Sequence, residues 1–271
     1  MRRVLFVCLP IVAIAVTVAA VAAPSAGGAV GTQDYVAVGD SYSSGTGTRA
    51  YDPSSGGCQR SSFAYPALWA QAHSAWSFSF TACSGATTDQ LIAGQLGTLS
   101  AETDLVTVSI GGNDAGFGPV MVTCQLRGPA ACDRAIADAE RFIAEQLPAR
   151  LDAAYAAISQ RAGAAEVVVL GYPQLFETGR CVTSIDAGRR TRLNTVADQL
   201  AAVTADRATA AGFTFADTRA VFAGHRVCSL DPWLNGPSWP LQESYHPSRL
   251  GHAHGFLPLL TALTDAAVAR D

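Results

Sequence analysis

A serine and a histidine far apart in the chain have the side chains that nucleophilic acyl transfer requires. Ser41 follows the apolar run Tyr35–Val38, within Gly39-Asp40-Ser41, where the end of a strand would expose its hydroxyl. A serine nucleophile needs a base, and histidine titrates near neutral pH. Of the five histidines, His246 lies in a loop before the last apolar segment, where the chain can return to the same sheet edge. The pair predicts acyl transfer through a covalent intermediate.

Three hydrogen-bond donors follow the ends of predicted strands and could stabilise the negative oxygen of a tetrahedral intermediate. They are the Ser41 N–H, the Gly85 N–H and the side-chain amide of Asn113. Gly85 lacks a Cβ, so its N–H can be approached closely. Two of these residues could also have a purely structural role. Ser41 could be an ordinary turn serine, and Asn113 in Gly111-Gly112-Asn113-Asp114 could only close a turn. Convergence at three strand ends favours an oxyanion hole.

The residues near each histidine indicate a catalytic role for His246 and argue against a metal site at the other histidines. Glu243 lies three residues before His246, where its carboxylate could orient the imidazole and stabilise the protonated form, as the acid of a triad does. His252 and His254 form an H-x-H pair, but no third ligand is apparent. We therefore expect neither a metal nor a cofactor.

Composition excludes several other classes of protein. The chain of 271 residues is 49% hydrophobic and 15% charged, so it should fold. Lysine is absent, which excludes Schiff-base enzymes and P-loop NTPases. The net charge of −4 argues against a nucleic-acid partner, because phosphate binding needs a basic surface.

Residues 1–29 have the organisation of an export signal. The pair Arg2-Arg3 precedes the apolar run Val4–Val21, and Ala20-Val21-Ala22 fits a small-x-small cleavage pattern. A membrane-anchor helix is the alternative, since about 18 apolar residues can just span a bilayer. We expect cleavage somewhere within 22–29 and a secreted, extracellular protein.

Removal of the signal leaves an even number of cysteines, for which disulfides are expected in an oxidising compartment. The six are Cys58, Cys83, Cys124, Cys132, Cys181 and Cys228. Zinc is the alternative, but the chain has no C-x2-C pair. Six cysteines allow 15 pairings, and spacing favours only Cys124–Cys132.

Alternating strand and helix patterns predict one α/β domain over residues 30–271. Five short runs are strand-like: Tyr35–Val38, Phe78–Thr81, Leu105–Ile110, Val167–Leu170 and Phe213–Phe215. Helical spacing lies between them, including one long segment from Ile136 to Ile158, bent at Pro148, and Leu257–Ala267 supplies a last helix. This order is typical of a parallel sheet covered on both faces, with its site beyond the carboxyl ends of the strands.

Four motifs in order resemble those of the SGNH (GDSL-type) hydrolase family. They are Gly39-Asp40-Ser41, Gly85 after Cys83-Ser84, Gly111-Gly112-Asn113-Asp114 and the late His246. The resemblance runs from about Asp34 to His254, and the cysteine pattern is similar to that of the secreted actinobacterial esterase, lipase and phospholipase branch. It implies a flavodoxin-like three-layer α/β/α domain that hydrolyses carboxylic esters.

The resemblance also implies roles and pairings. Ser41 would be the nucleophile, His246 the base, and Ser41, Gly85 and Asn113 the oxyanion hole. The implied disulfides are Cys58–Cys83, Cys124–Cys132 and Cys181–Cys228. The family has Asp where this chain has Glu243, and some similar secreted members orient the histidine with a backbone carbonyl. We expect a Ser41–His246 dyad with the Glu243 or Ser244 carbonyl, rather than a triad with the Glu243 carboxylate.

The expected partner is an ester substrate, either a lipid or a small acyl ester, with transient contact at a lipid surface by a monomer. A carbohydrate acetyl-esterase or a thioesterase is the alternative on the same scaffold, as is a binding protein that lost its chemistry. Trp233, Leu234 and Trp239 could either wall an acyl site or anchor a loop.

Overall fold

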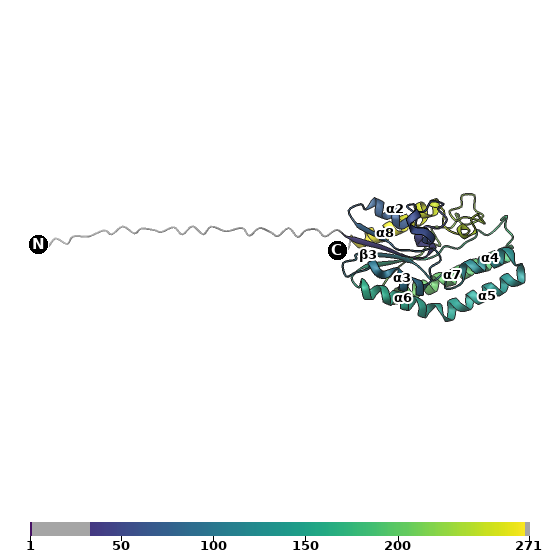
Figure 1. Ribbon diagram of the computed structural model, residues 1–271, viewed down its shortest axis with the longest axis horizontal. Coiled ribbons are helices and arrows are strands. Elements are labelled where there is room, and N and C mark those ends of the chain that lie inside the picture. Colours follow the sequence, from purple (N-terminus) through teal and green to yellow (C-terminus); the bar gives the residue numbers. More distant parts are fainter. Residues whose placement is uncertain (2–32, 269–271) are drawn as a thin grey trace. The chain divides into compact units, whose positions relative to one another are not determined.

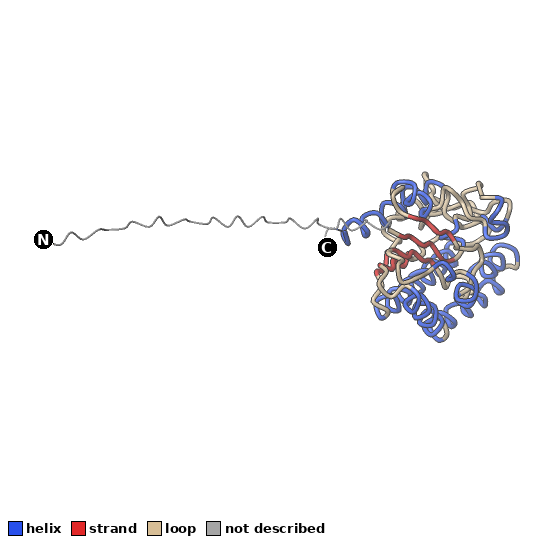
Figure 2. The backbone as a smooth tube through the Cα atoms, turned by 60° about the vertical axis from the view of Figure 1, so that its left-hand side comes forward, coloured by secondary structure: helices blue, strands red, loops and turns tan. Residues whose placement is uncertain are grey.

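The computed structural model describes Met1 and residues 33–268, and its centre is a five-stranded parallel sheet (Figures 1 and 2). The strand order is β2-β1-β3-β4-β5. The strands are β1 Asp34–Gly39, β2 Ser77–Phe80, β3 Leu105–Ser109, β4 Glu166–Leu170 and β5 Thr214–Ala216. The central strands β1 and β3 are buried almost throughout, which is why apolar residues predominate on both of their faces.

Helices cover both faces of the sheet and complete a three-layer α/β/α domain (Figure 1). One layer holds α2 Tyr65–Ala72 and α8 Leu257–Val268. The other holds α3 Thr88–Gly94, α4 Phe117–Leu126, α5 Pro129–Glu145, α6 Leu147–Arg161 and α7 Ala187–Ala210. The predicted fold class is confirmed.

The long helical segment around Pro148 is two helices rather than one bent helix. Helix α5 ends at Glu145, and α6 begins at Leu147 with Pro148 in its first turn. Proline is well placed there, because the first N–H groups of a helix have no intrahelical acceptor. The spacing of apolar residues continues across the break, since both helices turn buried faces such as those of Ile143 and Leu151 toward the same core.

Three disulfides join Cys58 to Cys83, Cys124 to Cys132 and Cys181 to Cys228. These are the pairings that the family resemblance implied. The first closes the loop that precedes Gly85, where the Ser84 N–H also donates to the Cys58 carbonyl at 3.0 Å. The second ties α4 to the start of α5.

The predicted export signal lies outside the described residues. None of the helices within residues 33–268 combines the length and the apolar character that crossing a bilayer requires. In the same part of the chain, no group of three or more His, Cys, Asp or Glu side chains is arranged to hold a metal ion. His252 instead has a packing role: it is buried, and its Nδ1 accepts from the Tyr65 N–H at 3.2 Å.

Candidate active site

Ser41 begins the short helix α1, Ser41–Ser44, directly after β1. Asp40 caps this helix, because its side chain accepts from the Tyr42 N–H at 3.0 Å. Gly39 before it has φ +123°, and a Cβ there would lie 2.5 Å from the Ser109 carbonyl oxygen. The turn therefore requires glycine, and it projects Ser41 beyond the carboxyl edge of the sheet.

The loop after the last strand brings His246 to Ser41. The His246 Nε2 lies 2.8 Å from the Ser41 Oγ. A short antiparallel contact supports the loop, in which the Asn235 N–H donates to the His246 carbonyl and the Tyr245 N–H donates to the Asn235 carbonyl, both at 2.9 Å. The two predicted reacting side chains are thus within hydrogen-bond distance of each other, although they are 205 positions apart.

A backbone carbonyl, not a carboxylate, contacts the other nitrogen of the imidazole. His246 Nδ1 lies 3.0 Å from the Ser244 carbonyl oxygen. A carbonyl can only accept, so Nδ1 carries the proton and Nε2 is free to accept the proton of Ser41. Burial lowers the pKa of His246 to about 4, and the bond to Ser244 acts in the opposite direction. The imidazole is therefore a neutral base at neutral pH.

The contacts of the Glu243 carboxylate are to Tyr51 and Arg49 rather than to the imidazole. Its Oε1 accepts from the Tyr51 hydroxyl at 2.7 Å, and its Oε2 lies 3.2 Å from the Arg49 Nε. The side chain is buried, and the Tyr51 hydrogen bond and the Arg49 charge compensate for part of the loss of water, while Oε2 has no hydrogen-bond partner among the described residues. Neither of these contacts joins Glu243 to the imidazole.

Asn113 and Gly85 lie on the turns that follow β3 and β2, the two strands that pair with β1. The Asn113 Nδ2 donates to the Ala86 carbonyl at 3.0 Å, which leaves the second amide hydrogen for another acceptor. Asn113 thus connects its own turn to the turn that carries Gly85. This geometry is compatible with both expected roles of Asn113, as a donor to the oxyanion and as a residue that closes a turn. Gly85 has φ +81°, a conformation that favours glycine, and no protein atom lies within 4 Å of the position that a Cβ would take, so the space beside its N–H is open.

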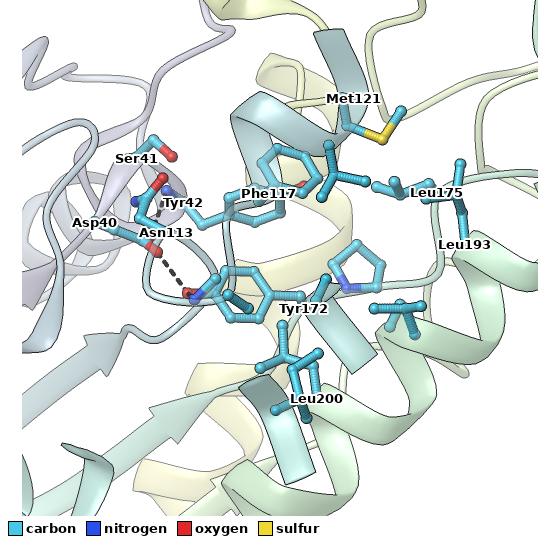
Figure 3. A pocket seen from close by; sticks show the side chains of 18 residues that line it. Asp40, Ser41, Tyr42, Asn113, Phe117, Met121, Tyr172, Leu175, Leu193 and Leu200 are labelled. Carbon is cyan, nitrogen blue, oxygen red and sulfur yellow. Dashed lines mark hydrogen bonds between the residues drawn. The ribbon is translucent and has the colours of Figure 1, made fainter. Parts of the chain in front are cut away.

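Sequence reasoning missed Tyr172, which connects the nucleophile turn to the Asn113 turn. Its hydroxyl donates to the Asp40 Oδ2, as Figure 3 shows, and accepts from the Gly112 N–H at 3.1 Å. The pKa of Asp40 is raised to about 7, because the effect of burial exceeds the opposite effect of the hydrogen bond from Tyr172. Tyr172 follows β4 within two residues, so the rule that found Ser41 and Asn113 at strand ends could also have found it.

The sequence profile of the GDSL-like Lipase/Acylhydrolase family matches residues 37–254, which include every residue of this site. The chain belongs to this family. It is a carboxylic ester hydrolase, as the motifs predicted. The chain is 49% identical over 247 residues to a lipase from Streptomyces rimosus, covering 91% of each protein, and 50% identical over 227 residues to Lipase 1 from Streptomyces coelicolor, covering 83% and 85%.

Solved structures agree with this assignment. The extracellular lipase of Streptomyces rimosus superposes with a TM-score of 0.84 at 50% identity, covering 85% of this chain and 99% of that one. Phospholipase A1 from Streptomyces albidoflavus NA297 gives 0.83 at 46% identity with the same coverage. An acetylxylan esterase from Geobacillus stearothermophilus gives 0.52 at 17% identity, covering 85% and 93%, which shows a shared fold alone.

The hydrolase has an apolar interior pocket that starts at Ser41 and runs between α4, α5 and α7. Figure 3 shows Ser41 and Asn113 at one end of the pocket and Leu175 and Leu193 at the other. The apolar lining comes from Ala115, Phe117, Val120, Met121, Ala139, Ile143, Pro173, Leu175, Leu193, Val196, Ala197 and Leu200. Its free space is about 60 Å³, so it can bury a short hydrocarbon segment beside the nucleophile.

The three apolar residues singled out before His246 do not line the interior pocket. Leu234 is buried, and Trp233 stacks on His225 at 3.7 Å between ring centroids, so both anchor the loop. Trp239 is largely exposed. The walls come instead from α4, α5 and α7, which follow β3 and β4 in the chain, and in the sequence their apolar positions cannot be distinguished from ordinary core positions.

Proposed function

We propose that the enzyme hydrolyses lipid carboxylic esters through an acyl-enzyme on Ser41. His246 Nε2 takes the Ser41 proton as Oγ attacks the ester carbonyl carbon. The carbonyl oxygen becomes an oxyanion, held by the Ser41 N–H, the Gly85 N–H and the Asn113 amide. The imidazolium, oriented by the Ser244 carbonyl, then gives its proton to the leaving alcohol, and water repeats these steps on the acyl-enzyme.

The observation that carries this proposal is the contact of 2.8 Å between His246 Nε2 and Ser41 Oγ at the mouth of an apolar pocket. The apolar lining beside Ser41 supports an apolar acyl group, and its free space of about 60 Å³ suits a short chain. The similarity to lipases and to a phospholipase A1 supports lipid esters, and transient contact with a lipid surface follows from such a substrate.

The test is a panel of esters of graded acyl length, with a phospholipid and an acetylated sugar included. We expect kcat/KM to rise with acyl length beyond acetate. Ser41→Ala should remove hydrolysis and labelling by an organophosphate, and Ser54→Ala, at an exposed site, is the matched control. A folded Ser41→Ala variant with more than about a tenth of the parent rate would refute the nucleophile. The acetylated sugar as best substrate would favour a carbohydrate esterase.

We also propose that the enzyme is exported, cleaved within residues 22–29, and active as a monomeric domain of residues 30–271. Three disulfides and the similarity to an extracellular lipase support export. The test is the intact mass of the secreted protein after alkylation without reduction, together with its mass by light scattering. Two or more alkylated thiols, or retention of residues 1–29, would contradict the proposal.

A further inference from the structure

A second apolar space, the outer groove, lies beside the interior pocket. Its sides are α4 and the segment around the 3₁₀ turn Leu241–Glu243, and its apolar side chains are Phe117, Met121, Val122, Leu126, Pro237 and Leu241. Phe117 and Met121 line both spaces and so form the partition between them. Figure 3 shows these two side chains along the wall of the interior pocket.

The reaction assigns the two spaces to different parts of the substrate. Ser41 and Asn113 line the interior pocket but not the outer groove, whereas His246 lines the outer groove but not the interior pocket. In acylation, His246 Nε2 delivers its proton to the oxygen of the leaving alcohol. The alcohol portion of the ester therefore lies on the side of His246, and whatever fills the outer groove is attached to it.

The lining of the outer groove suits hydrocarbon rather than sugar or a charged group. Apart from His246, none of its lining residues is acidic or basic. Several of its polar atoms already have partners, since Ser244 Oγ accepts from the Ser238 N–H and Gln125 Oε1 accepts from the Tyr245 hydroxyl, both at 2.9 Å, and Gln242 is the remaining polar side chain of the lining. A carbohydrate would lose hydrogen bonds to water here without replacing them.

The rim of the groove leaves large apolar side chains in water. Val122, Leu126 and Leu241 are 47%, 66% and 53% exposed, and they come from both sides of the groove. Contiguous apolar rims of this kind mark ligand grooves on soluble proteins. The free space of about 330 Å³ lies within the range of small-molecule sites, which is about 300–1,000 Å³.

We propose that the outer groove binds a second hydrocarbon chain, carried by the alcohol portion of a two-chain lipid ester. The scissile acyl chain occupies the interior pocket, and the second chain lies across Phe117 and Met121 toward Leu241. This inference rests on the proposed function, because it needs the ester carbonyl at Ser41. It makes the enzyme selective for diacyl over monoacyl lipids through contacts on the leaving-group side.

The test compares each diacyl lipid with the monoacyl lipid that has the same scissile ester. One arm uses dihexanoylphosphatidylcholine and 1-hexanoyl-lysophosphatidylcholine, and the other uses 1,2-dihexanoylglycerol and 1-hexanoylglycerol. All are kept below their aggregation concentrations, so adhesion to a lipid surface does not contribute. The two arms distinguish a phospholipid from a neutral lipid as the source of the second chain.

We expect the diacyl substrate to exceed the monoacyl one in kcat/KM by at least about tenfold in one arm or both. The double variant Val122→Asn/Leu241→Asn should reduce that ratio to within about threefold, because it removes apolar contacts from both sides of the groove. Leu230→Asn is the matched control, since Leu230 is fully exposed and lines neither space. Melting temperatures verify that each variant is folded.

Three outcomes would overturn the inference: no diacyl preference in either arm, a preference that persists in the double variant, or an equal loss in Leu230→Asn. Turnover of p-nitrophenyl hexanoate, which has no chain on its leaving group, separates this failure from failure of the proposed function. If the parent enzyme does not hydrolyse that ester, the acyl-enzyme itself is wrong. If it does, only the assignment of the outer groove is rejected.

Discussion

The Tyr42 hydroxyl donates a hydrogen bond of 2.7 Å to the Tyr245 carbonyl across 203 positions of the chain. Tyr42 follows the nucleophile, and Tyr245 precedes the base. The relative position of Ser41 and His246 is therefore fixed by their neighbours as well as by their own contact. Tyr245 also has φ +62°, an uncommon conformation for a residue with a side chain, so its backbone depends on such supports.

Tyr42→Phe should reduce both activity and stability. We expect kcat to fall about tenfold with little change in KM, because misplacement of reacting groups affects the transition state most. The unpaired Tyr245 carbonyl should reduce the free energy of unfolding by about 1–3 kcal/mol. Tyr155→Phe is the control, since that buried hydroxyl has no hydrogen-bond partner among the described residues. Equal kcat values in Tyr42→Phe and the parent would contradict a positioning role.

Glu243→Gln should change kcat/KM by less than about tenfold, a loss below about 1.4 kcal/mol. The reason is that the Ser244 carbonyl, which contacts His246 Nδ1, survives the substitution. His246→Ala should be almost inactive in the same assay. Stability is measured beside activity, because the variant loses the charge that faces Arg49. A fall beyond about a hundredfold in folded Glu243→Gln would identify a catalytic triad instead.

Asn113→Ala should lower kcat by about 10²–10³ through loss of one donor to the oxyanion. The substitution also removes the bond to the Ala86 carbonyl, so kcat is expressed per folded molecule. Asn113→Asp helps to separate the two effects, because it preserves the shape of the side chain and places an acceptor where the donor was. If Asn113→Ala lowers only the melting temperature, the residue has the turn-closing role alone.

The pH dependence of kcat/KM should have an acid limb near pH 4. His246 acts as a base only when neutral, and burial lowers its pKa to about 4, so protonation removes activity only below that pH. We expect a plateau from about pH 5 upward through neutrality and a tenfold loss per pH unit well below 4. A midpoint near the ordinary histidine value of about 6.5 would show that the imidazole is hydrated in the free enzyme.

Much of the fold could be predicted because buried parallel strands have a strong local signature. The runs Tyr35–Val38 and Val167–Leu170 lie within β1 and β4. The same local rule placed Ser41 and Asn113 at one sheet edge. Helix α4 was not predicted, since Phe117–Leu126 is apolar on most of its surface and has no clear helical periodicity.

The remaining features depend on contacts that local patterns do not encode. Whether Glu243 reaches the imidazole is decided by Tyr51 and Arg49, which lie nearly two hundred positions earlier and hold its carboxylate. The part played by Tyr172 likewise exists only once β1, β3 and β4 lie side by side. Both are tertiary effects, and spacing within a segment carries no information about them.

Tyr172 supports two turns with one hydroxyl group, since it contacts both Asp40 and Gly112. The turn that carries Ser41 and the turn that carries Asn113 are therefore coupled, and the free-energy effects of substitutions in the two turns should not add. The side chains of α4 and α7 that line the pocket do not take part in this coupling through Tyr172. During divergence, such an enzyme can change the shape of its pocket one residue at a time, whereas its two catalytic turns can change only together.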